Sequence, residues 1–167
     1  MRQYSVANWR DKRNIWRVVL SLSLSTVLST LPIGGLWSKL FPNLAVLAML
    51  YWGLNAQRLE SPLGLAFVVG LIYDWLHGGI YGAHSLAFVL LVMVSTRNVV
   101  YFQTATKAQQ IVRVFVVLAL IEISIFGLIE LFTAESVLRL TDLYQVALTA
   151  LMWPAMRFVL SFKFRTR

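Results

Sequence analysis

Hydrophobic residues form long continuous runs along this chain, and polar residues gather in the short stretches between them. The runs are about twenty residues long, which is the length that an α-helix needs to cross a bilayer. They do not alternate with polar residues, as the strands of a membrane barrel would. The pattern therefore predicts an all-α membrane protein, folded as a single six-helix domain. The predicted spans cover about residues 15–33, 43–56, 62–79, 83–102, 111–132 and 143–162.

Two of these spans carry features that make them irregular. The second, 43–56, covers only about 21 Å of a hydrocarbon core that is about 30 Å thick. Either part of the preceding loop dips into the membrane, or neighbouring helices shield this span. The last span contains Pro154, which should kink it.

Composition supports the membrane class. The chain is 59% hydrophobic and only 13% charged, whereas charged residues make up roughly a quarter of a soluble domain. The chain has no cysteine, which excludes disulfides, iron–sulfur clusters and thiol chemistry. The first apolar run follows a basic N-terminus as in a signal peptide, but no small-residue cleavage pattern follows it, so we interpret it as a retained anchor.

The positive charges predict the orientation. The formal net charge is +8, but the cations lie at the ends of apolar runs and form no patch suited to nucleic acid. Of the 15 lysines and arginines, all but Lys39 and Arg139 fall in segments that six spans would place on one side. Because positive residues favour the cytoplasm, both termini are predicted to be cytoplasmic.

Asp74 is the most informative residue, because an acid at mid-membrane depth costs on the order of 3 kcal/mol. It lies about 18 Å into the third predicted span, and Gly78, Gly79 and Gly82 follow it. Such an acid must face inward or serve a function. Four residues share one helical face, which we expect to pack against protein and not lipid: Ala66, Gly70, Asp74 and His77.

Glu122 lies at nearly the same depth in the fifth span, so two ionised carboxylates would each be costly there. We hypothesise that Asp74 and Glu122 face each other or a small polar cavity, with His77, His84 and Asn43 as neighbours. A structural alternative is that Asp74 ties the glycine-rich turn through backbone N–H groups. A proton relay is a further alternative, and a metal site is disfavoured because the spacing matches no defined motif.

A second pattern is a stripe of serines in the first span. Ser21, Ser25 and Ser29 recur every four residues, which places small side chains along one side of the helix and permits close helix contact. We favour plain helix packing over a hydroxyl-lined pore. The stripe, with Ala66 and Gly70, is our candidate for helix–helix contact with a partner.

Motifs of enzymes are missing from the sequence. It has no GxSxG elbow, no Walker loop and only two histidines. Intramembrane proteolysis would need a Ser–His pair or two aspartates on two helices. We therefore expect no catalytic residue, no cofactor and no bound metal.

One stretch resembles a known family. It begins with Phe41-Pro42-Asn43, continues with an apolar helix ending near Tyr51-Trp52, and then contains Gly64, Gly70-Leu71, Asp74, Gly78 and Gly82. This pattern, together with the length, the six spans and the basic ends, resembles the rod shape-determining protein MreD family of bacteria.

The resemblance implies a non-enzymatic, multi-pass subunit in the bacterial cytoplasmic (inner) membrane, which helps to lay down side-wall peptidoglycan. It implies association with MreC, and through MreC with MreB, RodA and its penicillin-binding transpeptidase. The surrounding lipid is a further partner, and a homodimer is considered as well. The family is also similar in fold to the substrate-binding subunits of energy-coupling-factor transporters, which are six-helix bundles with an outward-facing pocket. The alternative function is therefore a small-molecule or lipid-binding transport subunit with a pocket around Asp74.

Overall fold

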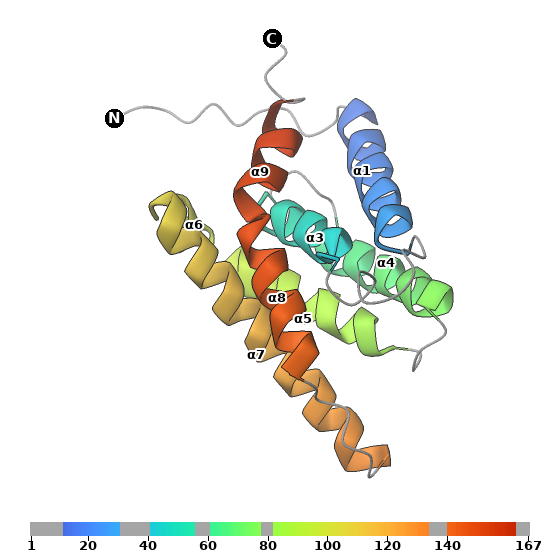
Figure 1. Ribbon diagram of the computed structural model, residues 1–167. Coiled ribbons are helices and arrows are strands. Elements are labelled where there is room, and N and C mark those ends of the chain that lie inside the picture. The colour runs from blue at the N-terminus through green and yellow to red at the C-terminus, as the bar shows by residue number, and fades with distance from the viewer. Residues whose placement is uncertain (1–11, 31–40, 56–60, 78–81, 134–139, 163–167) are drawn as a thin grey trace.

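The computed structural model describes residues 12–30, 41–55, 61–77, 82–133 and 140–162. All regular structure in these residues is helical, which confirms the all-α class (Figure 1). The helices, in chain order, are α1 (Lys12–Thr30), α3 (Leu44–Leu54), α4 (Pro62–His77), α5 (Ala83–Arg97), α6 (Val99–Gln103), α7 (Lys107–Thr133), α8 (Leu140–Leu151) and α9 (Trp153–Phe162).

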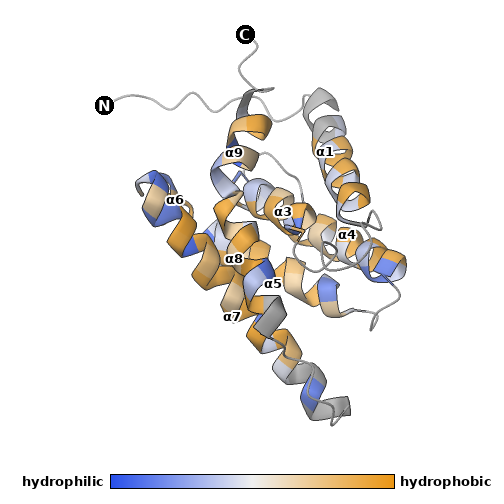
Figure 2. Cartoon of the chain, in the orientation of Figure 1, coloured by the Kyte–Doolittle hydropathy of each residue, from blue (hydrophilic) through white to orange (hydrophobic). Residues whose placement is uncertain are grey.

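Apolar residues extend over most of the helix surfaces in view (Figure 2). Within the described residues, the segment Lys107–Gly127 of α7 is long and apolar enough to cross a membrane alone, and α8 and α9 would together form a second such span. The apolar parts of α1, α3, α4 and α5 are shorter. These helices agree with a membrane protein, and the six-span arrangement stays a prediction.

Two predicted spans are each divided into two helices. Asn98 separates α5 from α6 in the fourth. In the sixth, α8 and α9 meet at Met152 with a bend of 42°. Pro154 is the second residue of α9, and a proline has no N–H to donate to the carbonyl four residues earlier. The predicted kink near Pro154 is confirmed.

Helix α3 lies in the middle of the bundle, in contact with α1, α5 and α9 (Figure 1). All of its residues except Leu44 and Val46 are buried. Its 11 residues rise only about 16 Å, roughly half of a bilayer core. Neighbouring helices therefore shield this short helix, as one of the two expected solutions requires, and its role as a membrane span stays a prediction. The preceding loop, 31–40, lies outside the described residues.

The serine stripe of α1 faces α3. The Trp52 indole Nε1–H donates to Ser21 Oγ at 2.9 Å, and the Ala45 backbone N–H donates to Ser29 Oγ at 3.2 Å. Ser25 is buried between them and donates to the Leu22 carbonyl. These small residues let the two helices approach closely. The stripe is used inside the bundle, as plain helix packing predicts, and its contact with a partner stays a prediction.

The start of α3 is held by α8. Asn43 is the N-cap residue of α3, and its Oδ1 accepts from the Val46 N–H at 3.3 Å. Its own backbone N–H donates to Thr149 Oγ1 at 3.0 Å. Pro42 is half-buried just before this cap. The Pro42-Asn43 pair thus begins α3 at a point fixed by a helix more than 100 residues later in the chain.

Candidate functional site

The candidate site is the junction between α4 and α5, which pack more extensively against each other than any other described pair. Ala66 and Gly70 of α4 are buried in this contact. A Cβ atom on Gly70 would lie 2.3 Å from Ser85 Cα and 2.6 Å from Ser85 N, which are backbone atoms of α5. Only glycine permits this approach, so Gly70 sets the distance between the two helices.

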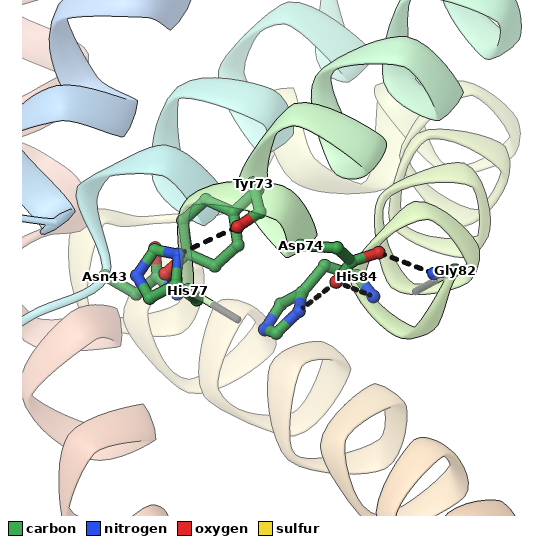
Figure 3. A network of polar contacts seen from close by, with 6 residues as sticks. All are labelled: Asn43, Tyr73, Asp74, His77, Gly82 and His84. Atoms are coloured by element: carbon green, nitrogen blue, oxygen red, sulfur yellow. Dashed lines mark hydrogen bonds and ion pairs between the residues drawn. The ribbon is translucent and has the colours of Figure 1, made fainter. Parts of the chain in front are cut away.

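Asp74 lies one turn beyond Gly70 and caps the start of α5 (Figure 3). Its Oδ2 accepts from the Gly82 N–H at 2.8 Å, and its Oδ1 accepts from the His84 N–H at 3.1 Å. Gly82 is the N-cap residue of α5, with a φ of 99° that favours glycine. Because glycine has no side chain to cap the helix, the carboxylate of α4 takes this role and lies at the positive end of the helix dipole.

A third hydrogen bond comes from the His84 side chain. Its Nδ1 lies 2.6 Å from Asp74 Oδ1. Asp74 is fully buried, whereas the His84 side chain is 40% exposed. The buried acid is therefore stabilised by two backbone N–H groups and one imidazole. This is the arrangement of the structural alternative, in which Asp74 ties the glycine-rich turn through backbone N–H groups.

The remaining polar side chains of the site contact Tyr73, whose ring is buried (Figure 3). Its hydroxyl accepts from Asn43 Nδ2 at 3.0 Å. The His77 ring stacks on the Tyr73 ring, with centroids 3.9 Å apart, and its Nδ1 donates to the Tyr73 carbonyl at 2.9 Å. Asn43 and His77 thus both contact Tyr73, and the His77 ring also stacks on the ring of His84, which is bonded to Asp74.

His77 differs from the expectation that it shares the protein-facing side of α4. It is exposed, whereas Ala66, Gly70 and Asp74 are buried. The reason is its position as the last residue of α4, where its side chain turns back along the helix onto Tyr73. Gly78 lies outside the described residues.

A cavity lies beside this junction. It has a volume of about 90 Å³ and lies between α5 and α7, where His84 and Glu122 share its wall with mainly apolar side chains such as Phe88 and Leu118. Asp74 does not line it. The Asp74 carboxylate is bonded to the start of α5, and a polar cavity shared by Asp74 and Glu122 stays a prediction.

Sequence reasoning missed three polar residues, two at the junction and one on α8. Tyr73 and Thr149 are buried polar residues that join α3 to α4 and α8. Ser85 is buried against Gly70, and its hydroxyl has no hydrogen-bond partner among the described residues. The only sequence signal was that each is a polar side chain inside an apolar run, and many other serines and threonines of this chain share it.

Comparison with known proteins gives one match. The sequence model of one family, described as rod shape-determining protein MreD, matches residues 11–163. This range includes every residue that the structure describes. No curated protein and no solved structure matches the chain.

Proposed function

Because the chain belongs to the MreD family of rod shape-determining proteins, we propose that it is an inner-membrane subunit of the bacterial elongation complex. The family determines rod shape and is not a known enzyme family. In the proposed role, the protein binds MreC and, through it, joins MreB, RodA and the transpeptidase that build side-wall peptidoglycan. The family match over residues 11–163 carries this proposal.

The proposed orientation follows from the charges. Four cations have side chains that the structure describes: Arg97, Lys107, Arg113 and Arg157. They lie at the end of α5, at the start of α7 and on α9, which meets α7 through a bond from Arg157 to Gln110. Because positive residues favour the cytoplasm, we place this end of the bundle, and both chain termini, in the cytoplasm.

The packing of the bundle leaves an outer face as the candidate contact for MreC. The serine stripe and the Ala66–Gly70 face are both used inside the bundle. A lateral groove of about 420 Å³ runs between α7 and α8. Its lining is apolar except for Tyr144 and includes Ala147 and Ala150, whose small side chains permit close helix approach. Since α7 is long enough to cross the bilayer, we propose that the single span of MreC binds in this groove.

The test places a bulky side chain in the groove. Ala147 is exposed, so Ala147→Trp should leave the bundle folded and obstruct a partner helix. We expect at least about a tenfold loss of co-purified MreC, since a steric penalty of 1–3 kcal/mol corresponds to roughly this change, and wider cells. Ser23→Trp is the matched control, because Ser23 is exposed in the groove between α1 and α4.

These experiments test two claims: that MreC binds in the groove between α7 and α8, and that the protein helps to determine rod shape. Loss of MreC with Ser23→Trp only would assign the partner to the other groove. Normal MreC recovery and normal cell width with both variants would contradict the proposed contact at α7 and α8. A chain whose deletion leaves rod-shaped growth unchanged would contradict the role itself.

The alternative of a transport subunit gains no support from the junction. The cavity beside His84 holds about 90 Å³, whereas sites for small-molecule ligands hold about 300–1,000 Å³. The Asp74 carboxylate, which was expected to bind the ligand, is fully buried and bonded to α5.

A further inference from the structure

A second cavity, of about 160 Å³, lies at the cation-rich end of the bundle. It is formed where the last residues of α3 and α6 meet α7 and α9. Its lining differs from that of the lateral grooves because it includes several polar side chains: Asn55, Gln103, Gln110, Arg157 and Ser161.

Gln110 holds the guanidinium of Arg157 in place. Its side chain is buried, and its Oε1 accepts from Arg157 Nη1 at 2.6 Å and from Trp153 Nε1 at 3.3 Å. Its Nε2 donates to the Ala105 carbonyl at 2.9 Å. Every polar atom of this amide is therefore engaged within the protein. Arg157 is an exposed residue that uses one of its five N–H donors in this contact, and its side chain lines the cavity.

The charge around the cavity is positive. Three acids have side chains that the structure describes, and all lie away from the cavity. Asp74 caps α5 at the far end of that helix from Arg97, and Glu122 and Glu130 lie about 18 Å and about 30 Å along α7 from Gln110. The ends of α3 and α6 each contribute only about half a negative charge. Arg157 carries a full positive charge, and the start of α7 adds about half of one.

A neighbouring arginine has different contacts from those of Arg157. Arg113 lies one turn from Gln110 but stacks over the Tyr101 ring, 3.4 Å from its centroid, and donates to the Tyr101 carbonyl. It is not part of the cavity wall. Arg157 is thus the cation that the fold directs to this cavity.

We propose that the cavity binds the phosphate group of an anionic phospholipid. Gln110 is the fourth residue of α7, about 5 Å from its start, so the cavity lies near headgroup depth. Arginine matches the geometry of phosphate oxygens. The Gln103 amide supplies further N–H donors, and the Asn55 amide supplies one N–H besides the one that it donates to the Tyr51 carbonyl. Basic pockets between helices on the cytoplasmic side are known sites for anionic headgroups. The lipid would then link α3, α6, α7 and α9 at the membrane surface.

The experiment measures thermal unfolding of the purified full chain in neutral detergent. Phosphatidylglycerol, phosphatidylcholine and inorganic phosphate are titrated separately. We expect phosphatidylglycerol to raise the unfolding temperature and the other two to have little effect. Arg157→Gln should weaken the apparent affinity for phosphatidylglycerol about tenfold, because it removes a charge-assisted hydrogen bond. Arg97→Gln is the matched control, since it removes the same charge at the same end but outside the cavity wall.

A second variant separates binding from folding. Ser161 is an exposed residue of the cavity wall, so Ser161→Phe fills the cavity and leaves Arg157 and Gln110 intact. We expect it to reduce the effect of phosphatidylglycerol as strongly as Arg157→Gln does, and it decides the question if the arginine variant does not fold. Equal loss with Arg97→Gln, or equal protection by phosphatidylcholine, would overturn the proposal. Equal protection by inorganic phosphate would overturn the assignment to a lipid.

Discussion

Replacement of Gly70 by alanine should separate α4 from α5. The added Cβ would lie 2.3 Å from Ser85 Cα and 2.9 Å from the His84 carbonyl carbon. Carbon atoms in van der Waals contact lie about 3.5–4.0 Å apart, and all of the contacted atoms belong to the backbone, which cannot rotate away. The helices must therefore move apart by roughly 1 Å or more, and the N–H groups of Gly82 and His84 move away from Asp74.

The effect of Gly70→Ala on the free energy of unfolding is the sum of two destabilising contributions and one stabilising contribution. Overpacking a well-packed interior costs about 1–3 kcal/mol, and weakening hydrogen bonds to a buried carboxylate adds about 1–2 kcal/mol. Alanine recovers about 0.8–1.0 kcal/mol because it favours the helix over glycine. The net loss in the free energy of unfolding is therefore about 2.5 kcal/mol. At about 2–4 °C per kcal/mol for a chain of this size, the unfolding temperature should fall by about 5–10 °C.

The assay is thermal unfolding in detergent micelles, followed by circular dichroism. Gly127→Ala is the matched control, because a Cβ on Gly127 meets nothing within 4 Å, and it should leave stability unchanged or raise it. Gly53→Ala should fall between the two, since its Cβ would lie 3.0 Å from the Ser95 Cβ, a side-chain atom. If Gly70→Ala is as stable as Gly127→Ala, the close approach of α4 and α5 is not a constraint and the argument fails.

Other contacts give further predictions, each measured by unfolding in the same micelles. Asp74→Ala should lose at least about 3 kcal/mol, because three donors lose their acceptor, whereas Asp74→Asn keeps one acceptor and should lose less; equal losses would contradict the capping role. A double-mutant cycle of Trp52→Phe and Ser21→Ala should show a coupling of about 1 kcal/mol through their hydrogen bond, and additivity would refute it. Ser85→Ala should be neutral or stabilising by up to about 1 kcal/mol, because its hydroxyl is buried without a partner in the described structure; a clear loss of stability would indicate a partner.

Several features of the fold were predictable because they depend on local sequence. Apolar runs of about twenty residues predicted helices, and the helices observed follow those runs. Pro154 predicted a kink because the missing N–H acts within one turn of its own position. Asp74 attracted attention for a similarly local reason, since one acid in an apolar helix must be explained wherever the helix packs.

The partners of these residues depended on the tertiary structure. Hydropathy separates inside from outside in a soluble protein, but here the residues that face lipid and those that face the core are both apolar. Trp52 is 1% exposed and Trp75 is 69% exposed, although both lie in apolar helices. Nothing in either local sequence distinguishes the two positions.

The polar contacts between helices also depend on the tertiary structure. Asn43 reaches Thr149 across 106 positions, and Arg157 reaches Gln110 across 47. Each of these contacts exists because two helices distant in sequence pack with one pair of polar groups in register. Local periodicity identifies which residues are polar within a membrane helix, and helix packing alone decides which of them meet.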